Sequence, residues 1–289
     1  MIPASFDYLA PRSVAEALSA LGRHGEDAKL LAGGHSLLPL LKLRLAQPKV
    51  LIDIGKIPGL NEIKQQGDRI VIGALATHYQ IESSALLKKS CPLLCQTAHA
   101  IGDVQVRNRG TIGGSLAHAD PAADWPAAVL ALGACLKIAG ASGERALESE
   151  NFFLGPLATA LEPREILIAV EVPAAGRRAG AAYQKMAQQA SGFAVVGVAA
   201  SLRLNGRGHL ENIGIGISGL ADKPFRARSV EAKLLGKKPS PKAIEDAAMV
   251  VADGVEALED LSAAADYRAH LARVYTARAI QAALKQAAR

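Results

Sequence analysis

The sequence has few of the residues that would indicate binding of nucleic acid. Only 4% of its 289 residues are aromatic, which leaves little surface on which bases could stack. The formal net charge of +6 comes from scattered basic residues, and the densest groups, such as Lys88-Lys89 and Lys237-Lys238, are only pairs. We therefore expect no nucleic-acid partner, whereas an anionic cofactor or an acidic protein partner would suit this charge.

Cysteine is also scarce. The chain has three, Cys91, Cys95 and Cys135, and their spacing lacks the second pair of ligands that a metal site would need. An iron–sulfur cluster would need four ligands, normally thiolates. We expect reduced thiols in a cytoplasmic protein, and no metal held by this chain.

No segment indicates secretion or a membrane span. Residues 1–6 lack the basic and apolar regions of a signal peptide. The longest apolar stretch, residues 126–136, is too short to cross a bilayer. The chain is therefore expected not to span a membrane.

The hydrophobic pattern predicts a mixture of helices and strands. Ser13 and Glu16 are spaced as a capping box before a helix. Residues 174–180 are small and contain glycine and arginine, so we place a domain boundary there. Strands are predicted at 29–32, 50–54, 166–173, 182–186, 195–204 and 210–218, a hairpin at 60–74, and helices at 92–101, 126–132, 225–235 and 266–288.

Two glycine-rich loops are the best candidates for a ligand-binding site in the sequence. The first is Leu31-Ala32-Gly33-Gly34-His35-Ser36, and the second is Arg109-Gly110-Thr111-Ile112-Gly113-Gly114-Ser115. Adjacent glycines let a ligand approach the backbone, and they allow positive φ angles that turn successive N–H groups toward one point. Each loop also carries hydroxyl side chains. Together the loops resemble two halves of a clamp on a pyrophosphate.

A third glycine motif, Gly214-Ile215-Gly216-Ile217-Ser218-Gly219, formally matches a dinucleotide fingerprint. That fingerprint requires a helix that starts within the motif, whereas Asp222-Lys223-Pro224 interrupts the chain here. An antiparallel meander is the favoured interpretation. No phosphate-binding G-x-x-x-x-G-K-[ST] motif occurs.

Asp124 follows the second loop and precedes an apolar helix. Its carboxylate could accept hydrogen bonds from ribose hydroxyls, or it could cap the helix, and the sequence leaves both roles open. Asp120 precedes Pro121 and is predicted to be a turn residue.

These motifs match a known family. Residues 32–39, 42–46, 107–114 and 119–124 closely resemble the FAD-binding medium subunit of molybdenum hydroxylases of the aerobic carbon monoxide dehydrogenase and xanthine dehydrogenase type. The resemblance covers essentially the whole chain. It implies an α+β fold, with a two-part FAD-binding domain of the PCMH type (vanillyl-alcohol-oxidase-like) at 1–175, its subdomains being about 1–55 and 56–175. A smaller C-terminal domain of antiparallel sheet and helices would cover 176–289.

The resemblance also implies roles for single residues. Asp124 would hold the adenosine ribose, Leu167 or Ile168 would line the adenine side, and Lys185 would approach the flavin or its ribityl chain. Many relatives carry an aspartate before an aromatic residue where this chain has Gly192-Phe193, so Phe193 could cover the flavin without offering a hydrogen bond. The two loops would wrap the FAD pyrophosphate with Ala32, Gly33, Gly34, His35, Ser36, Leu37, Thr111, Ile112, Gly113, Gly114 and Ser115.

By the same resemblance, the chain would be the electron-transfer subunit of a heterotrimer, and the complex would be a dimer of heterotrimers. A large subunit would carry the molybdenum-pterin cofactor, and a small subunit would carry two [2Fe-2S] clusters that pass electrons to FAD. The sequence contains no convincing catalytic dyad, and electron transfer needs none. A self-contained flavin oxidoreductase of the PCMH type and a flavin-free scaffolding subunit remain alternatives. The substrate and the electron acceptor stay open.

Overall fold

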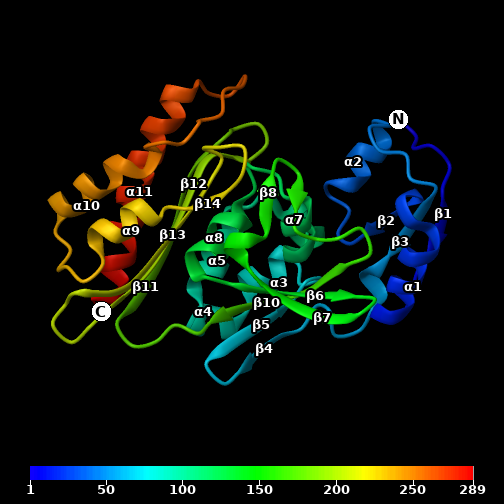
Figure 1. Ribbon diagram of the computed structural model, residues 1–289, viewed down its shortest axis with the longest axis horizontal. Coiled ribbons are helices and arrows are strands. Elements are labelled where there is room, and N and C mark those ends of the chain that lie inside the picture. The colour runs from blue at the N-terminus through cyan, green and yellow to red at the C-terminus, as the bar shows by residue number, and fades with distance from the viewer. Residues whose placement is uncertain (289) are drawn as a thin grey trace.

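Three hydrophobic cores follow one another along the long axis of the molecule (Figure 1). The computed structural model describes residues 1–288. The N-terminal lobe and the C-terminal helices lie at opposite ends, and a central five-stranded sheet with its helices lies between them (Figure 1). No helix within the described residues is long and apolar enough to cross a membrane.

The N-terminal lobe is a three-stranded parallel sheet in the order β1-β3-β2, with a helix packed against it. Ser13 caps α1 by accepting a hydrogen bond from the N–H of Glu16, and Leu21 on the apolar face of the helix is buried. The first glycine loop follows β2, at the carboxyl edge of a parallel sheet, where ligands commonly bind. The elements are β1 (Asp7–Leu9), α1 (Val14–His24), β2 (Ala28–Leu31), α2 (Leu37–Lys42) and β3 (Val50–Asp53).

The central part is an antiparallel sheet in the order β4-β5-β10-β6-β7, with helices packed on it. Its core contains Trp125, Ile70 and Ile72, all of them without exposed surface. The elements are β4 (Ile63–Gln66), β5 (Arg69–Gly73), α3 (His78–Ser83), α4 (Ala85–Ser90), α5 (Pro92–Ala100), α6 (Val104–Arg109), α7 (Ile112–His118), α8 (Asp124–Leu132), β6 (Cys135–Gly140), β7 (Gly143–Glu148), β8 (Phe153–Gly155), β9 (Ala158–Thr159) and β10 (Ile166–Pro173).

The C-terminal part is an antiparallel sheet in the order β11-β12-β13-β14. One face of the sheet packs on α8 and the other on α11, because successive strand residues alternate between the two faces. Ala181 and Tyr183 thus belong to the central core, whereas Ala182 belongs to the C-terminal core. The elements are β11 (Ala179–Ala187), β12 (Ala194–Leu204), β13 (Leu210–Ser218), β14 (Phe225–Arg226), α9 (Arg228–Leu234), α10 (Pro241–Ala248) and α11 (Ala265–Ala287).

The structure gives the third glycine motif a packing role. Gly214 and Gly216 lie in β13, between β12 and β14, so the predicted meander is confirmed. A Cβ on either glycine would overlap the carbonyl oxygen of Ala131 or Ala127 in α8. The glycines therefore let the sheet approach the helix backbone closely.

One predicted helix begins later than the sequence indicated. Phe225 and Arg226 pair with Ile217 and Gly216 as a short edge strand, and α9 starts only at Arg228. Residues 225 and 226 thus pair with the free backbone groups at the edge of β13 instead of forming the helix that the local sequence pattern predicts.

Candidate functional site

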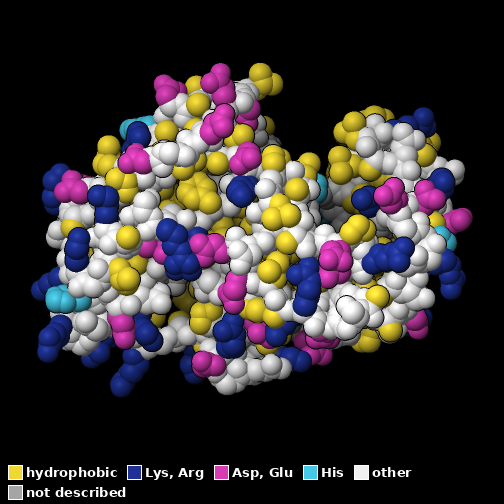
Figure 2. Space-filling model, viewed as in Figure 1, with side chains coloured by type: hydrophobic (Ala, Val, Ile, Leu, Met, Phe, Trp, Pro, Cys, Tyr) yellow, Lys and Arg dark blue, Asp and Glu magenta, His cyan; other side chains and the backbone are white. Residues whose placement is uncertain are grey.

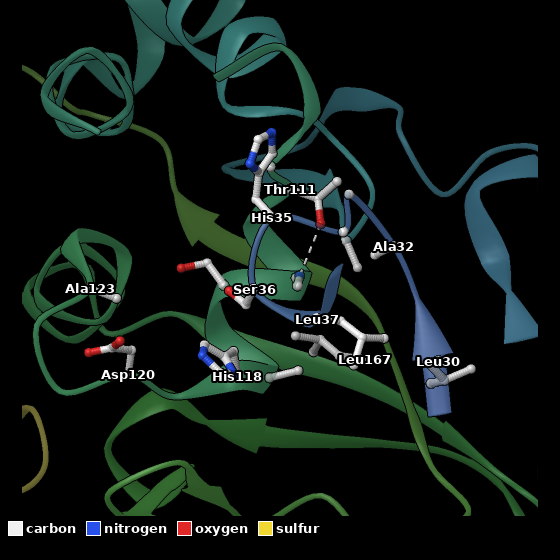
Figure 3. Close-up of a pocket in the computed structure, with 18 of the residues that line it drawn as sticks. Leu30, Ala32, His35, Ser36, Leu37, Thr111, His118, Asp120, Ala123 and Leu167 are labelled. Carbon is white, nitrogen blue, oxygen red and sulfur yellow. Dashed lines mark hydrogen bonds between the residues drawn. The ribbon is translucent and has the colours of Figure 1, made fainter. Parts of the chain in front are cut away.

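A cavity of about 640 Å³ is lined by both glycine loops and by residues of all three parts of the chain. The space-filling view shows a deep notch between the N-terminal lobe and the central part (Figure 2). The lining residues include Leu37 from the lobe, Leu167 from β10 and Phe193 from the loop before β12 (Figure 3 labels the first two). This size is typical of a site for a small molecule or cofactor.

The two glycine loops touch each other directly. A Cβ on Gly33 would overlap the carbonyl oxygen of Arg109 and would lie 3.0 Å from the Cα of Gly110. A Cβ on Gly113 would lie 2.5 Å from the Cβ of Ala74, at the end of β5. These two glycines thus serve the contact between protein segments. Gly33 lets the two loops touch as the halves of one site, and Gly113 lets the second loop approach the chain that follows β5.

The backbone conformation differs from the expectation for adjacent glycines. Of Gly33, Gly34, Gly113 and Gly114, only Gly34 has a positive φ, of 80°. Gly113 and Gly114 lie within α7 and have helical geometry. The turn of successive N–H groups through positive φ angles is therefore limited to the first loop.

The N–H groups of the two loops are used differently. In the second loop the N–H of Ile112 donates to Ala76, that of Gly113 to Ala74, and those of Gly114 and Ser115 to Thr111. Within residues 1–288, the N–H groups of Gly33, Gly34, His35 and Ser36 in the first loop donate to no protein acceptor. Four successive free N–H groups thus lie in the first loop, whereas four successive N–H groups of the second loop are used within the protein.

The hydroxyls of the loops also divide into two kinds. The Thr111 Oγ1 atom accepts a hydrogen bond of 3.1 Å from the N–H of Gly114 and caps α7 (Figure 3). In the part of the chain that the structure describes, the hydroxyls of Ser36 and Ser115 have no protein partner, and both residues line the cavity. Ser36 and Ser115 are thus free to bind a ligand, whereas Thr111 orders the helix.

Most of the residues predicted for the site line the cavity. Those that do are Ala32, Gly33, Gly34, His35, Ser36, Leu37, Thr111, Gly113, Gly114, Ser115, Asp124, Leu167 and Phe193. Ile112 is instead fully buried in the central core. The carbonyl of Ile168 accepts the N–H of Ala74, and its side chain packs on the N-terminal core. Lys185 also lies outside the cavity lining.

Lys185 and Asp124 form a buried ion pair. The Lys185 Nζ atom lies 2.8 Å from Oδ1 of Asp124, and it also donates to the carbonyls of Ala100 and Gly192, both at 2.6 Å. The Tyr183 hydroxyl donates to the same Asp124 oxygen at 2.6 Å. Lys185 thus binds Asp124 and Gly192, two residues that line the cavity, and its expected approach to the flavin stays a prediction. Lys185 joins β11 to α5, α8 and the loop that carries Phe193.

Asp124 is the first residue of α8, and Ala123 occupies the cap position. Its side chain therefore does not act as the helix cap that the sequence left open. Burial raises the pKa of Asp124, and the Lys185 amine and the Tyr183 hydroxyl act in the opposite direction. Asp120 is the turn residue expected, since its Oδ1 accepts the N–H of Ala122.

His78 was not predicted from the sequence, yet it lines the cavity although only 4% of its surface is exposed. The Nε1–H of Trp125 donates to its Nδ1 atom at 3.1 Å. His118 also lines the cavity, and it lies near Ser36 and Asp120 (Figure 3). No local pattern could have identified His78, because Trp125 lies 47 residues further along the chain.

The chain matches two protein-family models. Residues 4–175 match the FAD binding domain in molybdopterin dehydrogenase, and residues 181–283 match the CO dehydrogenase flavoprotein C-terminal domain. Among curated proteins, it is 42% identical to the carbon monoxide dehydrogenase medium chain of Hydrogenophaga pseudoflava, over 98% of each chain. It is 36% identical to the glyceraldehyde dehydrogenase medium chain of Sulfolobus acidocaldarius, over 97% of this chain and 99% of that one.

Solved structures agree with these matches. A chain of carbon monoxide dehydrogenase from Hydrogenophaga pseudoflava superposes with a TM-score of 0.96 at 43% identity, over 99% of both chains. A chain of quinoline 2-oxidoreductase from Pseudomonas putida 86 gives a TM-score of 0.93 at 33% identity, over the full length of both.

Proposed function

Since this chain belongs to the family of FAD-binding medium subunits of carbon monoxide dehydrogenase-type molybdenum hydroxylases, we propose that it is the FAD-carrying electron-transfer subunit of a heterotrimeric molybdenum hydroxylase. Bound FAD supplies the electron-carrying chemistry, because a flavin can accept electrons singly and release them in pairs. The residues of this chain bind and orient the cofactor.

The observation that carries the proposal is the row of free N–H groups at Gly33, Gly34, His35 and Ser36, at the wall of a cavity shared with the second loop. A pyrophosphate carries several anionic oxygens, and backbone N–H groups with hydroxyls can bind them without a lysine. We place the pyrophosphate against the first loop, with the Ser36 and Ser115 hydroxyls beside it.

The remaining parts of FAD are assigned to the other walls. Asp124 lines the cavity, and the Tyr183 and Lys185 side chains both bind its Oδ1 atom. Oδ2 is proposed to accept hydrogen bonds from the adenosine ribose. Leu167 is proposed to line the adenine. Phe193 is 45% exposed at the cavity wall and is proposed to cover the flavin ring.

We propose that electrons reach this subunit from the [2Fe-2S] clusters of a small subunit. A large subunit with the molybdenum-pterin cofactor would oxidise the substrate, and the complex would be a cytoplasmic dimer of heterotrimers. Two similar medium chains and one similar subunit beta belong to enzymes named for carbon monoxide, glyceraldehyde and caffeine, respectively. This range supports a shared electron-transfer role for the medium chain, with substrate choice made on the large subunit.

Copurification tests this function. The chain is expressed with the products of its neighbouring genes, and the purified complex is assayed for flavin, iron and molybdenum. We expect FAD in this chain, and iron and molybdenum in two others. Steady turnover of a small organic substrate by this chain alone would overturn the proposal.

A further inference from the structure

His78 is a buried side chain at the wall of the cavity. It is the first residue of α3, and Thr77 and Gln80 form a reciprocal capping box at the start of this helix. The N–H of His78 donates to the carbonyl of Gly110 at 2.9 Å, which ties α3 to the second glycine loop. The backbone thus fixes where the imidazole ring lies.

Trp125 determines which nitrogen of His78 carries the proton. An indole N–H can only donate a hydrogen bond, so the Nδ1 atom that accepts it, at 3.1 Å, must have its lone pair free. The neutral ring then carries its proton on Nε2. Trp125 is fully buried, so water does not compete for this bond.

The surroundings keep the ring neutral. Burial lowers the pKa of His78 to about 4, and the nearby side chains of His35 and Arg107 disfavour a further positive charge. The Arg107 guanidinium is itself paired with Glu82, whose carboxylate lies 2.9 Å from it. At neutral pH, His78 therefore presents a neutral N–H donor.

The Nε2–H group is left without a protein acceptor among residues 1–288. The atom lies beside Gly110, where an added Cβ would come within 2.5 Å of it, and both residues line the cavity. The donor faces the cavity that His78 lines, so a ligand in the cavity can reach it. A hydrogen-bond acceptor in the cavity would supply the missing partner.

We propose that the Nε2–H of His78 donates a hydrogen bond to an oxygen of bound FAD, and that Trp125 is the positioning residue that fixes this donor. The inference rests on the proposed function. Gly110 packs against Gly33 of the first loop and against Val106. Val106 lies next to Gly102, and Gly102 lies next to Gly192 in the loop of Phe193. The acceptor is therefore an oxygen of the pyrophosphate or of the flavin portion.

Binding measurements on the full chain test this donor. His78→Leu removes the N–H, and His78→Gln is the matched variant that retains one. We expect His78→Leu to bind FAD at least about tenfold more weakly than the wild type, and His78→Gln to recover most of the affinity. Calorimetry with ADP separates the two possible acceptors. If His78→Leu loses affinity for both ADP and FAD, the acceptor is an oxygen of the pyrophosphate. If it loses affinity for FAD alone, the acceptor is in the flavin portion. A His78→Leu chain that binds both ligands like the wild type would overturn the inference.

A second readout does not depend on the ligand. Nitrogen NMR of the wild-type chain is expected to show a protonated Nε2 and an unprotonated Nδ1 on His78, with a mixture of tautomers in Trp125→Phe. A protonated Nδ1 in the wild type would overturn the inference even if His78→Leu failed to fold. A folded wild-type chain that binds neither FAD nor ADP would instead overturn the proposed function, and this inference with it.

Discussion

The Lys185 Nζ atom lies 2.8 Å from the Asp124 carboxylate, and the two side chains are only 8% and 5% exposed. Asp124 begins α8, which follows the second glycine loop, whereas Lys185 is in β11 of the C-terminal sheet. Lys185 also binds Gly192, next to Phe193. One ion pair therefore links a cavity residue, the C-terminal sheet and the loop at the cavity wall.

Removing the positive charge from this pair should destabilise the fold strongly. Lys185→Met leaves the Asp124 carboxylate buried without its cation, which typically costs about 3–5 kcal/mol. The matched control is Lys242→Met, because Lys242 pairs with Asp246 on the surface, where the side chains are 79% and 60% exposed. We expect the control to change stability by less than about 1 kcal/mol in urea unfolding. Equal effects of both substitutions would show that the buried pair has no special role.

The contact between the loops should not tolerate a side chain at residue 33. Gly33→Ala would force the first loop away from the Arg109 carbonyl, and we expect FAD affinity to fall by about tenfold or more, since a displacement of the donors weakens several hydrogen bonds at once. Gly22 in α1 is the control, because a Cβ there meets nothing within 4 Å. Gly22→Ala should leave FAD affinity unchanged and stabilise the chain by at most about 1 kcal/mol. Titration of FAD into both variants measures the difference, and unchanged binding by Gly33→Ala would contradict this role.

Thr111 lines the cavity, but we expect its hydroxyl to contribute to the stability of the fold by capping α7. Thr111→Val removes the hydroxyl that caps α7 and should cost about 1 kcal/mol, whereas Thr111→Ser keeps the cap. Thermal unfolding of the chain without FAD checks this prediction. If Thr111→Val were as stable as Thr111→Ser, the capping role would be refuted.

His78 should make the chain less stable in mild acid. Its pKa is lowered to about 4 in the folded chain, whereas an unfolded histidine titrates near 6.5. Between these values the unfolded chain binds a proton that the folded chain does not, so stability falls as the pH falls. The loss from this residue should reach about 2 to 3 kcal/mol near pH 4.5.

The comparison with His78→Gln isolates this contribution from those of other groups. Urea unfolding at pH 7 and pH 4.5 should show a smaller loss of stability for His78→Gln than for the wild type. Parallel losses in the two proteins would mean that His78 titrates alike in the folded and unfolded chains.

The sequence predicted the two loops and most of the lining residues because their motifs are local. It could not predict how the N–H groups are used, since the acceptors of the second loop, Ala74 and Ala76, lie about 40 residues earlier. The role of Lys185 also depended on distant partners. Strand periodicity does place Tyr183 and Lys185 on one face of β11, which is the face that meets Asp124.

The third glycine motif shows the limit of pattern matching. The glycines at 214 and 216 fit a dinucleotide fingerprint, yet their backbone lies against α8 in an antiparallel sheet. Glycines at this spacing indicate only that another group lies close to the backbone. Here the approaching group is a helix of the same chain.

The central measurement is the binding of FAD to the full-length chain, by calorimetry and by flavin absorbance, alone and assembled with its partner subunits. We expect one FAD per chain, with binding weakened in Gly33→Ala and unchanged in Gly22→Ala. A correctly folded chain that binds no FAD in either state, or that binds FAD equally well with alanine at residue 33, would contradict this expectation.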